Sequence, residues 1–327
     1  MTDTARLAEA VARLRAGDVV AFPTETVYGL GADARNPAAV ARVFALKGRP
    51  TDHPLIVHIA SAALLPRWAA PVPPAAQALA AAFWPGPLTL ILPRAAGVPD
   101  AVTGGQLTVG VRCPAHPLAH ALLEACLAVG IDGLAAPSAN RFGHVSPTTA
   151  DHVRAEFGPQ VLVLDGGPAD VGIESTIVDL SRDAPRVLRP GMLDTARLAA
   201  AIGGEFAPAG ADAPRVSGSL AAHYAPATPL ELLPGDALIA RIQALSATGI
   251  PFAALVYGPV PEPPPAGLQV LRLPAEPAGY ARALYARLRE ADALGVARIL
   301  VEAPPADLPW LAIRDRLRRA AQGSGRS

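Results

Sequence analysis

Apolar residues recur every three or four positions at the start of the chain, a period typical of an amphipathic helix. Leu7, Val11 and Leu14 share one face of this helix, and Gly17 is suited to end it. An Asn-Pro pair at positions 36–37 predicts a second helix, with asparagine as its N-cap and proline in its first turn. Short apolar runs typical of strands are "VVAF" (19–22), "LIVHI" (55–59), "LTLIL" (88–92), "LTVGV" (107–111), "VLVL" (161–164) and "STIVDL" (175–180).

Strands that alternate with helical segments predict an α/β fold for the first part of the chain. We place this domain at residues 1–203, ending after a helix near Thr195 to Ile202. Residues 204–228 are rich in Gly, Ala and Pro, which predicts a linker. Residues 229–327 repeat the alternation with the strands "LELL", "FAALVY", "LQVLRL" and "RILVE", and predict a smaller, Rossmann-like α/β domain. This part has no G-x-G-x-x-G motif, so we infer no dinucleotide site there.

Composition narrows the class of protein. Hydrophobic residues make up 51% of the chain, as in a globular protein, and the formal net charge is +0, so any anion site must be local. The first helix mixes charged and apolar residues, unlike a signal peptide, and prolines interrupt the apolar runs, so we expect no membrane span. Cys113 and Cys126 are too few for a metal site and favour a reducing, cytoplasmic setting, with a single disulfide as the alternative.

Lys47 is the only lysine among the 28 Lys and Arg residues. It lies in "KGRP", just after the predicted second helix and two positions before Arg49. In an extended segment the side chains of residues i and i+2 point the same way, so both cations would converge on one chain of phosphates. A compact ammonium and a planar guanidinium bind oxygen differently, which would explain why arginine has not replaced lysine here. The alternative is a solvated basic turn.

Polar residues follow several of the predicted strands. "FPTETVYGLGADA" (22–34) places Thr26 among hydroxyl and carboxyl groups before two glycines, an arrangement typical of a ligand crevice at a strand end. An ordinary strand-to-helix turn is the alternative. Arg112 ends another strand and is suited either to bind a substrate carboxylate or to pair with a neighbouring acid. His58 also lies near a strand end, where a single histidine is more often structural.

Three further segments carry hydroxyl, amide and guanidinium groups: "PSANRFGHVSPTT" (137–149), "GIESTIVDL" (172–180) and "VLRPG" (187–191). Each taken singly is typical of a capped turn or a strand end. The sequence has no Walker A motif, no zinc-type cluster of His and Cys, and no evident nucleophile–His–acid triad. These features together favour chemistry by positioning and electrostatics over covalent or metal-centred hydrolysis.

The motifs "FPTETVYGLGADA", "KGRP..HPLIVHI", "VRCP", "PSAN..G..SPT", "GIESTIVD" and "LRPG" occur in this order, and with them the chain resembles the YrdC-domain family of threonylcarbamoyl-AMP synthases. The "HYAP" of the linker and the second domain resemble the long, two-domain form of that family. The resemblance implies a twisted, open, mixed sheet with a concave, positively charged ligand cavity. It also implies a nucleotidyltransferase that converts L-threonine, bicarbonate and ATP to threonylcarbamoyl-AMP and pyrophosphate, the first step of the N6-threonylcarbamoyladenosine modification of tRNA.

The resemblance implies roles for individual residues. Threonine would be bound by Thr26, His58, Arg112, Ser138 and Ser175. Lys47 and Arg49 would be catalytic, stabilising charge on the ATP phosphates. The nucleotide would also be contacted by His53, Thr108, Asn140, Ser146, Thr148, Arg189, His223 and Tyr224. Mg²⁺ would enter with ATP, bound through phosphates and water, and no tightly bound organic cofactor is expected.

The sequence departs from the family pattern in two places. The linker reads "VSGSLAAHYAP", without the Pro-Gly and the several basic residues common there, and position 53 is His where Asn is common. The alternative function is a double-stranded RNA- or tRNA-binding module of the same fold without turnover, against which the neutral net charge argues. The YrdC-like module of hydrogenase maturation factors is a weaker alternative, because those proteins carry Cys clusters. We expect the product to pass to a separate tRNA threonylcarbamoyl transferase complex, with at most weak RNA binding and no membrane partner.

Overall fold

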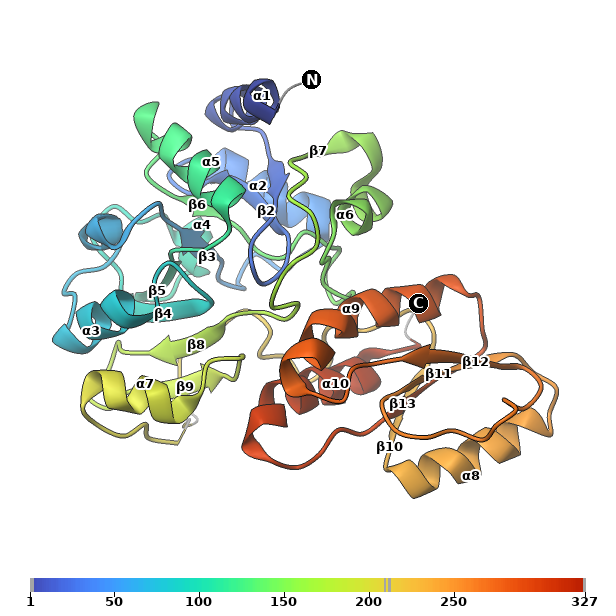
Figure 1. The fold of residues 1–327 in the computed structure, drawn as a ribbon. Helices are drawn as coiled ribbons and strands as arrows, with labels where there is room; N and C mark the ends of the chain where they lie inside the picture. Colours follow the sequence, from blue (N-terminus) through green and yellow to red (C-terminus); the bar gives the residue numbers. More distant parts are fainter. Residues whose placement is uncertain (1–2, 209, 211–212, 326–327) are drawn as a thin grey trace. The chain divides into compact units, whose positions relative to one another are not determined.

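A computed structural model describes residues 3–208, 210 and 213–325, and these form two compact units (Figure 1). The first unit comprises Met1–Phe142, Pro147–Asp170 and Glu174–Ser219, and the second comprises Gly143–Ser146, Val171–Ile173 and Leu220–Ser327. Two short segments, at 143–146 and 171–173, therefore belong to the second unit although the residues around them in the sequence belong to the first. The division after Ser219 lies within the segment that the sequence predicts as a linker.

The first unit is built on a nine-stranded mixed sheet. Its strands are β1 (Val20–Phe22), β2 (Gly29–Asp33), β3 (Ile56–His58), β4 (Leu88–Pro93), β5 (Thr108–Arg112), β6 (Leu134–Ala135), β7 (Leu162–Val163), β8 (Thr176–Asp179) and β9 (Arg186–Arg189). They lie in the order β7-β1-β2-β6-β3-β5-β4-β8-β9. The pairs β1–β7, β3–β5 and β4–β8 are parallel and the other neighbours are antiparallel, which confirms the mixed sheet expected from the sequence.

Helices of the first unit pack on this sheet and form its core with it. They are α1 (Asp3–Arg15), α2 (Pro37–Lys47), α3 (Pro74–Phe83), α4 (Asp100–Thr103), α5 (Pro117–Ala128), α6 (Ala150–Phe157) and α7 (Thr195–Ile202), with 3₁₀ turns at Ala62–Arg67 and Gly158–Gln160. The start of α2 confirms the predicted cap, because the Asn36 side chain accepts hydrogen bonds from the amides of Ala38 and Ala39. The helix ends at Gly48, whose φ of 62° is readily adopted only by glycine.

The sequence pattern did not predict three strands, β2, β6 and β9. The glycines of "GLGADA" indicated a turn before a helix, but β2 begins at Gly29 and pairs antiparallel with β1. Gly31 is needed there for packing, since a Cβ at this position would lie 2.7 Å from the ring of Phe22. The alternative of a strand-to-helix turn is therefore wrong, and Thr24 to Tyr28 form the loop of a hairpin.

The second unit contains a four-stranded parallel sheet in the order β10-β13-β11-β12. Its elements are β10 (Leu230–Leu233), α8 (Gly235–Ser246), β11 (Phe252–Val256), β12 (Leu268–Arg272), α9 (Pro277–Ala293), β13 (Ile299–Glu302), a 3₁₀ turn (Leu308–Trp310) and α10 (Leu311–Gly323). Along the strand order of this sheet, the chain moves from β10 to β11 in one direction and from β12 back to β13 in the other. Right-handed crossovers therefore place α8 and α9 on opposite faces of this sheet. The parallel α/β arrangement confirms the Rossmann-like prediction.

The carboxyl edge of the second sheet, where such sheets commonly bind ligands, is occupied by a side chain of the protein. The carboxylate of Glu302, at the end of β13, accepts hydrogen bonds from the amides of Tyr257 at 2.9 Å and Gly258 at 2.8 Å. These amides follow β11, the neighbouring strand. The contact satisfies the donors that a bound phosphate would otherwise use at this edge.

Both cysteines are free thiols in the core of the first unit, so the alternative of a single disulfide is wrong. Burial and the charge of Glu25 raise the pKa of Cys113 to about 11, and burial raises the pKa of Cys126 to about 12. Neither thiol therefore ionises near neutral pH. Within the described ranges, no helix is both long enough and apolar enough to cross a membrane.

Candidate active site

The loop between β1 and β2 is held by hydrogen bonds among its own residues. The Thr24 hydroxyl donates to the carbonyl of Val27 at 2.6 Å and accepts from the amides of Thr26 and Val27, both at 3.2 Å. The hydroxyls of Thr24 and Thr26 are 2.8 Å apart. Because the Thr24 proton is used on Val27, the Thr26 hydroxyl must be the donor in this pair. Thr26 therefore offers a ligand a lone pair and not a proton.

Arg112 lies at the end of β5, where its side chain is 4% exposed. Its guanidinium donates to the carbonyl of Gly86 at 3.3 Å, to the hydroxyl of Thr26 at 2.8 Å and to Oε1 of Glu25 at 2.6 Å. The second oxygen of Glu25 accepts from the amide of Ala115 at 3.1 Å. A guanidinium has five N–H donors, so one donor on each terminal nitrogen is still free to bind an anion.

The ion pair with Glu25 is the functional feature that the sequence analysis did not identify. The alternative that Arg112 pairs with a neighbouring acid is confirmed, and its binding of a substrate carboxylate stays a prediction. A buried arginine requires a carboxylate partner, and Glu25 is the residue directly before Thr26 in the strand-end loop. That adjacency was the only signal in the sequence.

His58 lies beside Arg112, its partner in the parallel pairing of β3 with β5. Its ring packs edge-to-face against Phe22 with centroids 6.0 Å apart, and its Nδ1 is 3.3 Å from the carbonyl oxygen of Ile56. Burial first, and then the charge of Arg112, lower the pKa of His58 to about 3. The imidazole is therefore neutral at physiological pH and can act as a hydrogen-bonding group but not as a cation.

Ser175, just before β8, and Arg189, at the end of β9, are brought into direct contact. The Arg189 guanidinium donates to the carbonyl of Ser175 at 3.0 and 3.1 Å and to its hydroxyl at 3.1 Å. The Ser175 hydroxyl is also 2.8 Å from that of Thr89. A residue predicted for threonine thus adjoins a residue predicted for the nucleotide.

Lys47 is the last residue of α2, so the extended geometry assumed for Lys47 and Arg49 is wrong. The Lys47 ammonium donates to the carbonyls of Ser138, at 2.6 Å, and Asn140. Burial first, and then the charge of Arg49, hold the pKa of Lys47 well below its ordinary value. The guanidinium of Arg49 donates instead to the carbonyl of Pro54 at 2.9 Å and to the hydroxyl of Ser217 at 3.2 Å.

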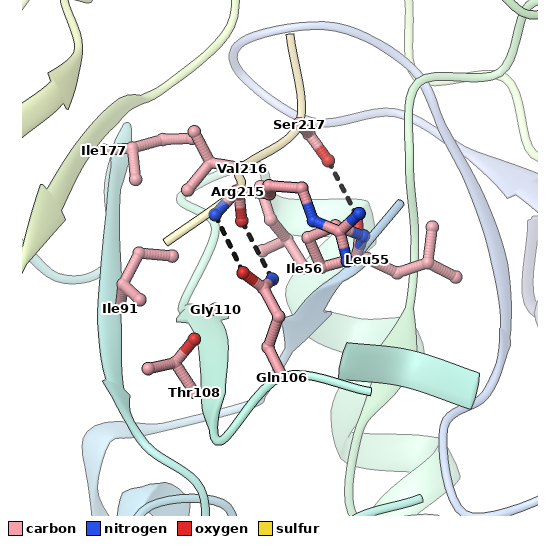
Figure 2. A pocket seen from close by; sticks show the side chains of 11 residues that line it. Leu55, Ile56, Ile91, Gln106, Thr108, Gly110, Ile177, Arg215, Val216 and Ser217 are labelled. Atoms are coloured by element: carbon pink, nitrogen blue, oxygen red, sulfur yellow. Dashed lines mark hydrogen bonds between the residues drawn. The ribbon is translucent and has the colours of Figure 1, made fainter. Parts of the chain in front are cut away.

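A segment of the predicted linker, Arg215–Ser217, lines a pocket of the first unit together with residues of β3, β4, β5 and β8 (Figure 2). The side-chain amide of Gln106 forms two hydrogen bonds with the backbone of Arg215, at 2.8 and 3.0 Å. Val216 packs against Ile56, Ile91 and Ile177, and Thr108 lines the same pocket. A cavity of about 10 Å³ remains beside these side chains, which is room for about one water molecule.

The segment also reaches two residues predicted for ATP. The Arg189 guanidinium donates to the carbonyl of Ser217 at 2.8 Å, and Arg49 donates to its hydroxyl. His53 lies nearby in the sequence and packs edge-to-face on Phe142, with ring centroids 5.5 Å apart. Burial, followed by the charge of Arg49, lowers the pKa of His53.

The other predicted nucleotide residues divide between the two units. Thr148, in the first unit, donates its amide to Nδ1 of His152 at 3.2 Å. Ser146, His223 and Tyr224 belong to the second unit and are buried there. The Tyr224 amide donates to Nδ1 of His223 at 3.0 Å, and Tyr224 has a φ of 60°, uncommon for a residue other than glycine. Their roles in nucleotide binding stay predictions.

Two family models together match most of the chain. The Sua5, YciO and YrdC model, described as telomere recombination, matches residues 12–191, and the model of the C-terminal domain of threonylcarbamoyl-AMP synthase matches residues 187–322. The threonylcarbamoyl-AMP synthase of Pyrococcus abyssi is 41% identical over 320 residues, which cover 94% of this chain and 92% of that protein. The threonylcarbamoyl-AMP synthase of Bacillus subtilis is 44% identical over 244 residues, covering 72% and 68%.

A solved structure matches the fold of both units. The crystal structure of P. abyssi Sua5 complexed with L-threonine aligns with a TM-score of 0.88 at 37% identity, covering 99% of this chain and 97% of that one.

Proposed function

Since this chain belongs to the threonylcarbamoyl-AMP synthase family, we propose that it joins L-threonine, bicarbonate and ATP at the site around Arg112 and releases pyrophosphate. Its activity is the synthesis of threonylcarbamoyl-AMP. The observation that carries the assignment of the site is Arg112, a buried cation held by Glu25 and Thr26 that retains free donors. Such a group is suited to bind the carboxylate of an amino acid with two parallel hydrogen bonds.

The threonine pocket follows from the groups around Arg112. We assign the substrate carboxylate to the two free donors of Arg112, and the substrate amine or hydroxyl to the lone pair of Thr26. The neutral imidazole of His58, next to Arg112 in the sheet, adds a hydrogen-bonding group without adding charge. Ser138 and Ser175 complete the pocket by analogy with the family motifs.

The phosphates of ATP are assigned to the cations that meet the segment 215–217. Arg49 and Arg189 both donate to Ser217, so phosphate oxygens that replace this residue would find two guanidinium groups in place. Lys47 uses two of its three N–H donors on backbone carbonyls, and the third is free to reach a phosphate. The remaining nucleotide contacts are assigned to His53, Thr108, Asn140, Ser146, Thr148, His223 and Tyr224.

Magnesium would enter as part of the MgATP substrate. Among residues 3–208, 210 and 213–325, no group of three or more His, Cys, Asp or Glu side chains is arranged to hold a metal ion. We propose that phosphate oxygens and water hold the metal, as is usual for Mg²⁺ bound with a nucleotide.

The reaction would proceed in two stages. The deprotonated amine of threonine adds to bicarbonate, or to CO₂ derived from it, and gives an N-carboxylate with loss of water. An oxygen of this carboxylate then attacks the α-phosphorus of ATP, the bond to the β-phosphate oxygen breaks, and pyrophosphate leaves. Lys47 and Arg49 would stabilise the charge that develops on the phosphates in the second stage.

The product is an activated adenylate that needs an acceptor. We propose that it passes in the cytoplasm to a separate transferase complex, which modifies tRNA. In this assignment the site binds ATP and threonine. Direct binding of RNA by this chain contributes little to the modification of tRNA.

The assignment is tested by following pyrophosphate release with ATP, Mg²⁺, bicarbonate and L-threonine, with mass spectrometry for the adenylate. Release should require both threonine and bicarbonate. Arg112→Lys keeps the charge but loses the two-donor geometry, and should raise the KM for threonine by roughly 10- to 100-fold with little change in the KM for ATP. Arg42→Lys, at an exposed arginine paired with Asp18, is the matched control. Release that is independent of threonine would refute the assignment.

A further inference from the structure

One residue, Lys47, holds the turn that follows β6 at three backbone positions. Its ammonium donates to the carbonyls of Ser138, at 2.6 Å, and Asn140, and its own carbonyl accepts the amide of Phe142 at 2.8 Å. The side chain of Lys47 is 3% exposed, so these contacts are made away from bulk water, where hydrogen bonds to a charged group are strong.

The two carbonyls belong to residues with different assigned ligands. Ser138 is assigned to threonine and Asn140 to the nucleotide, and they are two positions apart in "PSAN". In the part of the chain that the structure describes, the half-buried hydroxyl of Ser138 has no hydrogen-bond partner within the protein. Its position therefore depends on the backbone of the turn. Lys47 holds this backbone together with hydrogen bonds to the β2 hairpin, such as that from the amide of Ala139 to the carbonyl of Tyr28 at 2.8 Å.

The chemistry of the contact explains why this residue is lysine. An ammonium presents three tetrahedral donors at one point, so it can reach two carbonyls of a tight turn together. A guanidinium is planar and larger, and its donors are spread over a fixed fork. Arginine at position 47 would have to displace the turn to make both contacts, even though the rest of the chain uses arginine.

We propose that Lys47 is a positioning residue for the threonine pocket in addition to its contact with ATP phosphates. By holding the turn from Ser138 to Asn140, it sets the Ser138 hydroxyl for threonine before any nucleotide binds. The proposal rests on the proposed function of this site. It predicts that the affinity for threonine in the absence of nucleotide depends on Lys47. A role limited to phosphate binding does not predict this.

Titration calorimetry of L-threonine into the full chain without nucleotide tests this prediction. We expect Lys47→Met to weaken threonine binding about tenfold or more, as Ser138→Ala does. The matched control is Arg49→Met, the same apolar replacement two positions on, whose hydrogen bonds go to Pro54 and Ser217. It should change the threonine affinity by no more than about twofold. In turnover, Lys47→Met should raise the KM for both threonine and ATP, and Arg49→Met the KM for ATP.

Each outcome decides the proposal. Wild-type threonine affinity in Lys47→Met, with Ser138→Ala weakened, overturns it and leaves Lys47 with phosphates only. Failure of the wild-type chain to bind threonine overturns it together with the proposed function. Thermal unfolding shows whether Lys47→Met is folded; if it is not, Lys47→Arg replaces it, and wild-type threonine affinity in that variant overturns the proposal because charge alone would then suffice.

Discussion

At the scale of single residues, the buried ion pair of Arg112 and Glu25 is the main electrostatic feature of the proposed site. Arg112 and Glu25 are 4% and 6% exposed and their atoms are 2.6 Å apart, so each charge depends on the other. Removal of one partner of such a pair leaves an uncompensated buried charge, which costs about 3–5 kcal/mol of stability. A substrate carboxylate on Arg112 would supply a replacement charge.

Glu25→Gln keeps the shape of the side chain and removes its charge. We expect the free energy of unfolding to fall by about 3 kcal/mol, because Arg112 loses its counter-ion. Saturating L-threonine should restore part of this loss, so the rise in Tm on adding threonine should be larger in the variant than in the wild type. A rise in the variant that is equal to or smaller than that of the wild type would contradict the binding of the substrate carboxylate by Arg112.

His58 makes stability depend on pH. Its pKa is lowered to about 3 in the folded chain from 6.5, so the unfolded chain binds more protons below pH 6.5 and folding stability is lost as the pH falls. We expect the free energy of unfolding to drop by about 2 kcal/mol from this group between pH 7 and pH 5. Urea unfolding of the wild type and of His58→Gln at both pH values measures the contribution of His58 to the free energy of unfolding. Equal pH dependence in the two proteins would mean that His58 is charged or exposed.

At the scale of structural elements, loops and turns contribute several of the proposed site residues. The hairpin loop of β1 and β2 contains Thr26, and the turn after β6 contains Ser138 and Asn140. The segment Arg215–Ser217 contacts Arg49 and Arg189, while the sheet fixes His58 and Arg112 beside each other. Of these, the segment at 215–217 is held both by side chains of other segments and by its own, since Ser217 donates to the carbonyl of Pro54 at 3.1 Å and Arg215 pairs with Asp52 at 2.7 Å. Phosphates bound by Arg49 and Arg189 as proposed would replace the contacts of these arginines with Ser217.

Gln106→Ala removes both hydrogen bonds that hold the backbone of Arg215. Each such bond contributes about 1 kcal/mol, so we expect the amides of residues 213–219 to exchange with solvent roughly tenfold faster or more. Hydrogen-exchange mass spectrometry measures this rate, and Gln269→Ala, at an exposed glutamine of β12, is the control. Because ATP would have to displace the segment, its apparent affinity should rise in Gln106→Ala. A weaker affinity for ATP would mean that the segment forms part of the nucleotide site.

Charge balance is the relevant property at the scale of the whole molecule. The net charge is +0, and arginines such as Arg13, Arg154 and Arg241 are paired with Glu or Asp. A surface of paired charges releases few counter-ions from a nucleic acid, so we expect a low affinity for RNA with only a weak dependence on salt. This argues against the alternative of an RNA-binding module without turnover.

Binding of labelled tRNA by fluorescence anisotropy distinguishes the two functions. At physiological salt we expect a Kd no tighter than about 1 μM, the range of non-specific contacts, and no effect of tRNA on pyrophosphate release. Tight, salt-dependent tRNA binding combined with no threonine-dependent turnover would favour the alternative instead.

The sequence by itself determined the class of fold and most elements and named the candidate site residues, because these depend on local patterns. The Asn36-Pro37 pair and the hydrophobic period predicted α2, and ordered motifs indicated the family. Only the tertiary structure decided which groups meet. The strand β2, the pairing of Glu25 with Arg112, the turn held by Lys47 and the place of Val216 in the pocket all join residues distant in sequence or depend on packing, which no local pattern records.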